Sequence, residues 1–404
     1  MKLSIVHPMD PCIQGLGGFN TCIDGVLRYA PDTWDLELIG VTRDPDARPA
    51  GRWTPLEFGG RRIQFYPSLV ETEPDKVRPV PLSLRFVLAC RARRVRPSGD
   101  VVQFHRPESG YAMRLTGRQQ AVYFIHNHPE EVVSEFSDVR WRRLGWLFER
   151  VLWDRLRQAD MIVVVDPRSR SWVGKKSEAF ARRTHWLPQW ADDRFFHAAD
   201  RNTRDMDRVA LRKAADLPLD LRVIGFAGRL ETQKDPKLLL DAFGRVSTRR
   251  PDTALVYVGA GRMEQTIRQS AQSMGLGDRV RVIQPTPREA LASVYRGFDV
   301  TVCSSGFESG PRVIFESLAC GTPVASFDVG QVADLLHDAT PSGAGSLVEE
   351  RNSVSLADAI ERILEFPVSE ERVRQCRSVV ADRTPRRALG ALFDLYGSAL
   401  KQAE

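Results

Sequence analysis

Short apolar runs alternate with amphipathic helical patterns along nearly the whole chain. Each apolar run has the length of a strand, and the segments between the runs repeat apolar positions at helical spacing. Strands separated by helices predict parallel sheets covered on both faces by helices. The expected strands are Lys2–His7, Leu36–Thr42, Val101–Phe104, Ala121–His126 and Met161–Val165, then Arg222–Phe226, Ala254–Val258, Val280–Ile283, Val300–Val302 and Pro323–Phe327.

The two sets of strands predict two α/β domains in this chain of 404 residues, each large enough for its own core. We place the boundary near Pro188–Asp200, which gives domains at 1–192 and 193–385 and a final helix at 386–404. The clearest helical patterns are Asn20–Tyr29, Val139–Gln158, Pro236–Arg245 and Arg262–Met274.

The segment 305–324 predicts a polar loop, a short helix and a new strand. Ser309 suits the N-cap of this helix and Pro311 its first turn. Gly321 and Pro323 then end the helix. The unpaired amides at its start, with the positive end of the helix dipole, form a site for an anion such as a diphosphate.

Two carboxylates flank this predicted anion site. Glu308 precedes the helix, and Glu316 lies almost two turns further along it. Because carboxylates accept hydrogen bonds from hydroxyl groups, the pattern suits a ligand that is part phosphate and part polyhydroxyl. A nucleotide sugar has this chemistry.

The same segment resembles the E-x7-E signature of the retaining GT4-type glycosyltransferases. The matching residues are Glu308, Glu316, Gly310, Leu318, Ala319, Gly321, Thr322, Pro323 and Val324. Three further stretches resemble motifs of that family and follow in its order. They are the glycine loop Gly15–Asn20, the G-R-L and K-D pattern within Gly225–Pro236, and the strand with its glycine loop Val256–Gly261. The resemblance covers nearly the whole chain and implies the GT-B fold, two facing Rossmann-like domains with parallel sheets. It also implies that the helix 386–404 crosses back to the first domain.

The resemblance implies a retaining, metal-independent glycosyltransferase that moves a sugar from a UDP-, GDP- or ADP-sugar to a hydroxyl of a glycan, glycolipid or small-molecule acceptor. It implies no further cofactor. Arg229 and Lys234 would hold the diphosphate, Glu316 the ribose, and Glu308 and His126 the sugar. The catalytic set is therefore Arg229, Lys234, Glu308 and His126, and further donor-binding positions are Gly17, Gly18, Gly228, Ser309, Gly310, Pro311, Arg312, Val313 and Glu316.

Assignments in the first domain have alternatives. His126 stands at the usual place of the family's first-domain histidine, with His128 two residues further on. His105 follows another apolar run and is a candidate for the acceptor cleft together with Asn20, although a structural role for His105 is equally credible. Gly17 and Gly18 would let the backbone approach a ligand, or would form a plain turn.

Two positions depart from the family's pattern. Gln189 and Trp190 replace the first residues of the usual N-G-V-D segment. Ser309–Arg312 replaces the common G-F-G and the small or apolar residue after it, so Arg312 is either a determinant of substrate charge or an ordinary surface arginine. A non-catalytic nucleotide-sugar binding subunit and a sugar phosphorylase or hydrolase on the same fold are the alternative functions.

Composition restricts the remaining classes. The hydrophobic content of 42%, the charged content of 27% and the net charge of +6 are typical of a globular protein and give little support to nucleic-acid binding. Scattered cysteines, no secretory signal and no apolar run near 20 residues favour a cytoplasmic protein. The basic segment 140–153 could contact the inner membrane face, but packing on the sheet is favoured. The D-x-D triplet at Asp44 lies in a proline-rich loop and predicts no metal site.

Overall fold

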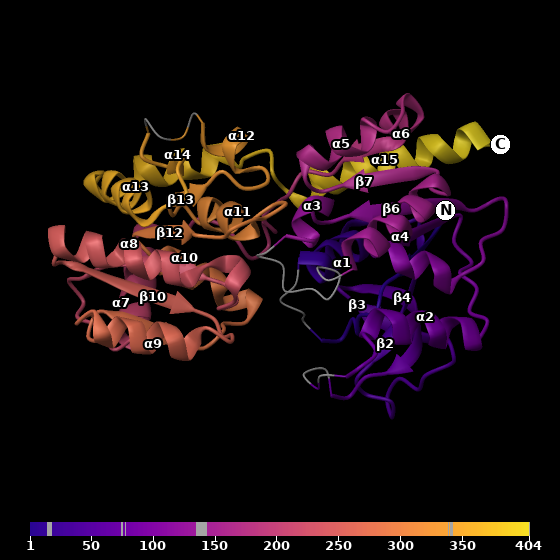
Figure 1. Cartoon of the computed structure of the whole chain (residues 1–404), viewed down its shortest axis with the longest axis horizontal. Helices are drawn as coiled ribbons and strands as arrows, with labels where there is room; N and C mark the ends of the chain where they lie inside the picture. The colour runs from indigo at the N-terminus through magenta and orange to yellow at the C-terminus, as the bar shows by residue number, and fades with distance from the viewer. Residues whose placement is uncertain are drawn as a thin grey trace. The chain divides into compact units, whose positions relative to one another are not determined.

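The computed structural model describes residues 1–13, 18–73, 76, 78–134, 144–337, 339 and 342–403. They form two compact units (Figure 1). Unit 1 contains Met1–Val133, Arg140–Leu187 and Arg386–Glu404, and the main segment of unit 2 is Pro188–Pro385. The division after Leu187 lies five residues before the one placed after Asp192 from the sequence.

Unit 1 is built on an eight-stranded sheet with the order β3-β4-β2-β1-β5-β6-β7-β8. Neighbouring strands are parallel except for the β3–β4 hairpin at one edge. The chain leaves β1 toward β2 and later returns to its other side at β5, so the strand order reverses there, where open α/β sheets bind ligands. The strands are β1 Lys2–Val6, β2 Asp35–Thr42, β3 Thr54–Phe58, β4 Arg61–Val70, β5 Val101–Phe104, β6 Gln120–Ile125, β7 Met161–Val164 and β8 Thr184–Trp186.

Helices cover this sheet, and the last of them comes from the C-terminus of the chain (Figure 1). On α15, Phe393 meets Trp34 edge to face at 5.2 Å between ring centroids, and Tyr396 stacks on the same indole at 6.4 Å. The helices are α1 Gly18–Tyr29, α2 Leu82–Ala92, η1 Pro107–Ala112, α3 Pro129–Val132, α4 Gly145–Arg157, α5 Pro167–Gly174, α6 Glu178–Arg183 and α15 Pro385–Ala403. The helix expected at Val139–Gln158 is present as α4, while 139–143 lie outside the described residues.

Unit 2 is built on a six-stranded sheet, all parallel, with the order β11-β10-β9-β12-β13-β14. Its strand order reverses at β9, which pairs with both β10 and β12. The strands are β9 Arg222–Ala227, β10 Thr253–Val258, β11 Val280–Ile283, β12 Val300–Cys303, β13 Val324–Phe327 and β14 Gly345–Val348.

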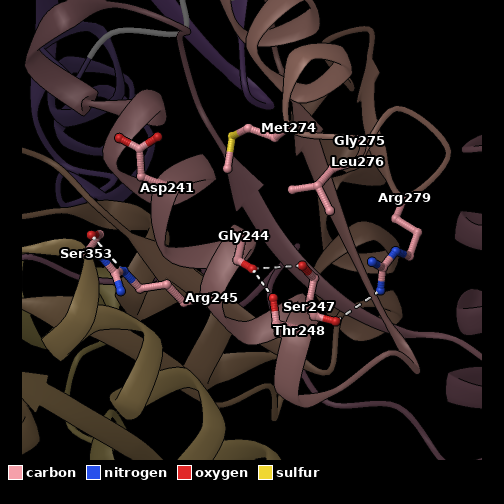
Figure 2. A pocket seen from close by; sticks show the side chains of 10 residues that line it. All are labelled: Asp241, Gly244, Arg245, Ser247, Thr248, Met274, Gly275, Leu276, Arg279 and Ser353. Carbon is pink, nitrogen blue, oxygen red and sulfur yellow. Dashed lines mark hydrogen bonds between the residues drawn. The ribbon is translucent and has the colours of Figure 1, made fainter.

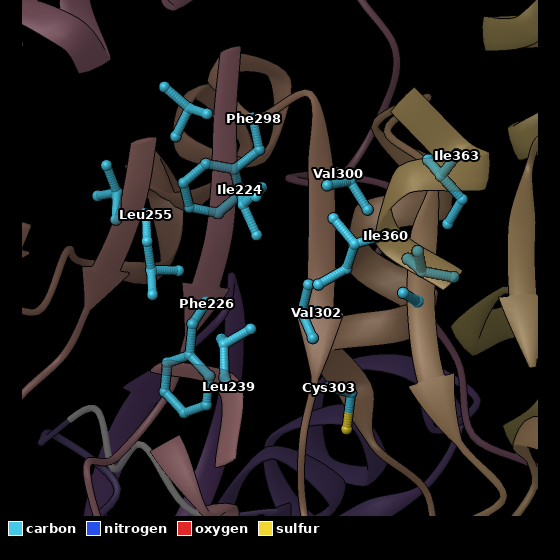
Figure 3. Packing of buried hydrophobic residues seen from close by; sticks show 14 of the residues in the cluster. Ile224, Phe226, Leu239, Leu255, Phe298, Val300, Val302, Cys303, Ile360 and Ile363 are labelled. Carbon is cyan, nitrogen blue, oxygen red and sulfur yellow. The ribbon is translucent and has the colours of Figure 1, made fainter. Parts of the chain in front are cut away.

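The core of unit 2 lies between this sheet and its helices. Ile224, Leu255 and Val300 from the sheet and Ile360 from α13 are fully buried together (Figure 3). The helices and turns are α7 Arg201–Ala214, η3 Thr232–Lys234, α8 Pro236–Arg249, α9 Glu264–Ser273, η4 Arg288–Ala290, α10 Leu291–Gly297, α11 Arg312–Ala319, α12 Val332–Leu336, α13 Ser353–Glu365 and α14 Glu370–Val379.

All ten predicted strands are present, and β3, β4, β8 and β14 were not predicted. The predicted parallel sheets are confirmed, and the unit 1 sheet carries one additional antiparallel pair, β3–β4, at its edge. Gly59 and Gly60, with φ of +60° and +81°, form its tight turn. Pro67 lies inside β4 and Arg61 begins it, which obscured the strand pattern.

The start of the helix α11 also corrects the sequence analysis. Ser309 is not its N-cap, because the helix begins at Arg312 and Pro311 holds the N-cap position with extended backbone and no side-chain cap. The predicted end is confirmed, since Gly321 follows the C-cap Cys320 with φ of +78°. Within the described residues, no helix has the length and apolar character needed to cross a bilayer.

Candidate functional site

In unit 2, Lys234 and Glu308 meet beyond the ends of neighbouring strands. Lys234 ends η3, after β9, and Glu308 lies in the loop after β12. Lys234 Nζ forms an ion pair with Glu308 Oε1, and Ser305 Oγ donates a hydrogen bond of 2.8 Å to the same oxygen. The carboxylate side chain is 11% exposed. This partly desolvated pair places a cation and a carboxylate at the carboxyl edge of the sheet, where such folds bind ligands.

Two residues that the sequence analysis missed hold this loop. Arg351 donates hydrogen bonds to the carbonyl oxygens of Ser304 and Ser305 at 3.1 and 3.0 Å, and pairs with Asp235 at 2.6 Å. Asp235 caps α8 with left-handed backbone, φ +43° and ψ +58°. Such strain in a residue with a side chain persists only where its surroundings enforce it. The K-D pair at 234–235 is the sequence signal that could have identified Asp235.

Arg229 differs from Lys234 in its surroundings. Its side chain is exposed, and in the described part of the chain no ion pair to its guanidinium is found. The preceding Gly228 lies where the loops after β9 and β10 touch, because a Cβ on Gly259 would lie 1.8 Å from the Gly228 carbonyl oxygen. The glycine loop of the third motif therefore permits close approach of two backbones, and leaves the Arg229 side chain in solvent.

The loop that carries Glu308 leads directly into α11. Ser309 and Pro311 are buried, Arg312 and Val313 form the first turn, and a Cβ on Gly310 would meet Gln189 at 2.2 Å. Ser309 Oγ is buried without a hydrogen-bond partner in the described structure. A buried hydroxyl without a partner destabilises the fold, and a hydrogen bond from a ligand would offset that cost. Ser309 therefore fits a ligand contact better than the capping role expected from the sequence.

Glu316 lies almost entirely buried on α11, at 7% exposure. Tyr295 Oη donates a hydrogen bond of 2.9 Å to its Oε2, and Arg312 Nε lies 3.6 Å from its Oε1. Burial raises the pKa of Glu316, while the charges of Arg312 and Arg288 oppose that shift. A buried carboxylate beside these donors can accept hydrogen bonds from a polyhydroxyl ligand with little competition from water.

Arg312 is not an ordinary surface arginine. Its side chain is 12% exposed and lies over the Trp190 ring at 5.3 Å. It also donates a hydrogen bond of 3.3 Å to Gln189 Oε1. The two departures from the family pattern, at Gln189–Trp190 and at Arg312, are therefore in contact with each other. This contact could not be predicted from the sequence, because more than a hundred residues separate the two stretches.

In unit 1, three histidines follow the carboxyl ends of β1, β5 and β6: His7, His105 and His126. His105 Nδ1 and His126 Nε2 are 2.8 Å apart, and their rings stack with centroids 5.1 Å apart. The Phe19 ring lies 4.3 Å from that of His126 and 5.9 Å from that of His7. The sequence analysis had named His105 and His126. It missed His7, although the same signal, a histidine after an apolar strand, was present.

Burial keeps this cluster neutral. It lowers the pKa of His126 to about 3, and the nearby Arg106 charge adds to the shift. It also lowers the pKa of His7 and His105 well below their ordinary value, because the charged imidazolium loses its hydration. The cluster therefore offers neutral imidazoles at physiological pH.

The other predicted positions of unit 1 have distinct places. His128 accepts a hydrogen bond of 3.3 Å from the Glu130 amide and so caps α3. Asn20 hydrogen-bonds His7. Gly18 begins α1 and has open space at its Cβ position, and Gly17 lies outside the described residues.

One group in the described residues could supply metal ligands. Ligand atoms of Cys22, His105 and His126 lie within 4.8 Å of one another. Two nitrogens on one tetrahedral zinc ion, at about 2.0 Å each, would lie about 3.3 Å apart. The 2.8 Å between His105 Nδ1 and His126 Nε2 is shorter and matches a direct hydrogen bond. The arrangement of these residues therefore fits a histidine pair better than a zinc site. Asp44 and Asp46 of the D-x-D triplet are exposed.

A separate pocket of about 680 Å³ lies along the C-terminal part of α8 (Figure 2). Arg245 hydrogen-bonds Ser353 at 3.3 Å, and Arg279 hydrogen-bonds the Ser247 carbonyl at 3.4 Å. It is lined by Asp241, Gly244, Arg245, Ser247, Thr248, Met274, Gly275, Leu276, Arg279 and Ser353. None of the predicted donor-binding residues lines this pocket, which we separate from the candidate site.

Comparison with known proteins bears on both units. Residues 207–377 match the family described as glycosyl transferases group 1. A D-inositol 3-phosphate glycosyltransferase of Corynebacterium diphtheriae is 30% identical over 249 residues, which are 60% of this chain and 56% of that protein. An alpha-D-kanosaminyltransferase of Streptomyces kanamyceticus is 27% identical over 307 residues, 72% of this chain and 75% of that protein.

A solved structure matches the whole chain. Anabaena HepE in complex with UDP-glucose covers 98% of this chain and 100% of its own, with a TM-score of 0.70 and 17% identity. At this identity the likeness shows the fold alone, and the predicted GT-B fold is confirmed. The matched region spans little more than half the length of the inositol phosphate relative.

Proposed function

We propose that this chain, in which residues 207–377 belong to the group 1 glycosyltransferases, moves a sugar from a nucleoside diphosphate sugar to an acceptor hydroxyl. The observation that carries the proposal is the Lys234–Glu308 pair beside the start of α11. It combines, in unit 2, a cation and a helix start for a diphosphate with a carboxylate for hydroxyl groups. HepE, whose solved structure contains UDP-glucose, has the same fold.

Binding of the donor replaces the Lys234–Glu308 ion pair with contacts to the donor. The diphosphate competes with Glu308 for Lys234, and Arg229, exposed in the described structure, adds a second cation. Once displaced, the Glu308 carboxylate accepts hydrogen bonds from sugar hydroxyls. In the transition state the leaving diphosphate gains charge, so both cations act there most strongly. Glu316 accepts the ribose hydroxyls, and Ser309 Oγ gains the partner that it lacks.

We infer retention of configuration and independence of a metal from the resemblance to GT4-type enzymes. In that mechanism the acceptor attacks from the face that the diphosphate leaves, and a departing phosphate oxygen takes the proton of the acceptor hydroxyl. Arg229, Lys234 and the α11 amides supply the positive charge that a metal ion would otherwise bring. His126, neutral in unit 1, is assigned to the donor sugar.

The acceptor is a polyol or sugar hydroxyl. The two relatives are named for transfer involving inositol 3-phosphate and for kanosaminyl transfer, so both names involve polyhydroxyl compounds. We assign the acceptor to unit 1, as in the family that the chain resembles. Glycans, glycolipids and small molecules all present such hydroxyls.

A thermal-shift panel tests the donor site. UDP, GDP, ADP and their sugar conjugates are added with and without EDTA to the wild type, Lys234→Ala and the matched Lys237→Ala. Lys237 is half exposed and pairs with Asp241 at 2.8 Å on the surface of α8. We expect one nucleotide to raise the melting temperature of the wild type and Lys237→Ala, with or without EDTA, because ligands that bind only the folded state stabilise it.

Lys234→Ala should lose most of this shift. The absence of a shift for every nucleotide in the wild type would contradict the proposal. A shift without turnover of the donor, in the presence of polyol acceptors, would instead identify a nucleotide-sugar binding subunit. Release of sugar to water or phosphate alone would identify a hydrolase or phosphorylase.

A further inference from the structure

A buried chain of hydrogen bonds in unit 1 ends at His126. Gln103 Nε2 lies 2.8 Å from Tyr396 Oη, and Gln103 Oε1 lies 3.2 Å from His105 Nε2. His105 Nδ1 lies 2.8 Å from His126 Nε2. The four side chains are 0% (Gln103), 1% (Tyr396), 2% (His105) and 8% (His126) exposed. The chain thus joins the C-terminal helix α15 to the ends of β5 and β6.

The chemistry of the amide determines where the protons lie. A carbonyl oxygen only accepts, so His105 must donate to Gln103 through Nε2–H. A neutral imidazole carries one proton, which leaves a lone pair on His105 Nδ1. The 2.8 Å bond to His126 therefore takes its proton from His126 Nε2–H. His126 Nδ1 is then left with a lone pair and can only accept.

This order of hydrogen-bond donors and acceptors requires that the imidazoles of His105 and His126 both stay neutral. Burial disfavours the charged form of each, and the Arg106 guanidinium disfavours a positive charge on His126. A protonated His105 would bring a second proton to Nδ1, opposite the His126 Nε2–H. The buried position of the pair thus maintains a single arrangement of protons.

We propose that Gln103 and His105 are positioning residues that hold His126 as the Nε2–H tautomer, and that the Tyr396 hydroxyl anchors Gln103 in this role. The consequence for catalysis rests on the proposed function. With a lone pair on Nδ1, His126 accepts a hydrogen bond from a sugar hydroxyl and cannot donate one to a phosphate or ring oxygen. The C-terminal helix thus sets the hydrogen-bonding role of a residue assigned to the sugar.

Nuclear magnetic resonance of the full chain with nitrogen-15 labelled histidine reads the tautomer directly. His126 signals are assigned by their loss in His126→Phe. We expect Nε2 to be protonated and Nδ1 bare in wild-type His126 from pH 6 to 8. An Nδ1–H tautomer, or a charged imidazole in this range, would overturn the proposal.

Gln103→Leu removes the acceptor that orders the chain. We expect the His126 signals to become a mixture of both tautomers, and Tyr396→Phe to cause a smaller change in the same direction. Gln119→Leu is the matched control, because Gln119 donates to the carbonyl oxygens of Pro97 and Gly99 at 3.0 and 2.8 Å. It should lower stability without altering the tautomer. An unchanged tautomer in a folded Gln103→Leu would show that Gln103 is merely structural.

Kinetics separate this inference from the proposed function. In Gln103→Leu we expect kcat for nucleoside diphosphate release to fall about three- to tenfold, the value of one hydrogen bond, with KM for the donor unchanged. Gln119→Leu should retain the wild-type kcat per folded molecule. If the wild type turns over no nucleotide sugar, the proposed function fails while the resonance experiment still determines the tautomer. Turnover with an unchanged kcat in Gln103→Leu would overturn the inference alone.

Discussion

The candidate site residues of the two units use opposite electrostatics. In unit 2 they form ion pairs, Lys234 with Glu308 and Arg312 with Glu316, at the ends of strands and the start of a helix. In unit 1, His7, His105 and His126 are neutral, because burial lowers the pKa of each. The same type of sheet edge thus holds ion pairs in one unit and neutral imidazoles in the other.

The difference corresponds to what each unit is proposed to bind. A diphosphate carries several negative charges and changes charge as it leaves, so fixed cations stabilise it. A hydroxyl remains neutral, and a neutral imidazole can orient it without attracting stray anions. Four experiments test this contrast, from the largest expected effect to the smallest.

Removal of the diphosphate cation should have the largest effect. Lys234→Ala and Arg229→Ala are expected to lower kcat/KM for sugar transfer about 100- to 1000-fold, the range seen for loss of one group that stabilises transition-state charge. Unfolding by urea should show little loss of stability, because the Arg229 side chain is exposed and the Lys234 side chain is only partly buried. Lys237→Ala should retain full activity. Wild-type rates in both Lys234→Ala and Arg229→Ala would contradict the role of these cations at the diphosphate.

Glu316→Gln should affect binding more than folding. Loss of charged hydrogen bonds to the ribose is expected to raise the Kd of the nucleotide about 10- to 100-fold. Because burial raises the pKa of Glu316, the ionised carboxylate opposes folding above its pKa, and the amide should not lower the melting temperature of the unliganded protein. Calorimetry and thermal melts measure the two quantities. A large fall in melting temperature with unchanged affinity would assign Glu316 to folding instead.

The neutral histidines predict a pH dependence of stability. Their pKa is lower in the folded chain than in the unfolded one, so below about pH 6.5 the unfolded state binds more protons and folding stability falls. Each such histidine contributes about 1.4 kcal/mol per pH unit there. Urea unfolding at pH 5 to 7.5 should give a shallower slope for His7→Leu than for the wild type. An identical slope would show that His7 is not neutral when folded.

The smallest effect is expected from metal removal. EDTA should leave the rate of transfer within about twofold, because protein cations supply the charge at the diphosphate. Asp44→Asn should also leave it unchanged, since Asp44 is exposed in a loop. Loss of activity with EDTA and its recovery with Mg²⁺ or Mn²⁺ would contradict metal independence, and persistence of the effect in Asp44→Asn would exclude the triplet as the metal site.

The sequence by itself determined the repeated strand and helix pattern, because apolar periodicity is local. The GT-B fold was predicted from the resemblance of contiguous motifs, such as the stretch around a helix start that holds Glu308 and Glu316, and residues 207–377 match the group 1 glycosyl transferases. The edge hairpin escaped prediction, since a two-residue turn and mixed polarity mimic a loop. The start of α11 escaped as well, because Pro311 could serve as N-cap or first turn by type alone.

Only the tertiary structure decided which distant residues meet. Arg312 reaches Gln189 and Trp190, and Arg351 reaches the loop at Ser304, across separations that leave no spacing to recognise. Tyr396 and Gln103 are 293 positions apart, yet one hydrogen bond joins them. The physical reason is that hydrogen bonds and burial act over a few ångströms in space. The tautomer inferred for His126 therefore depends on the packing of α15 within unit 1.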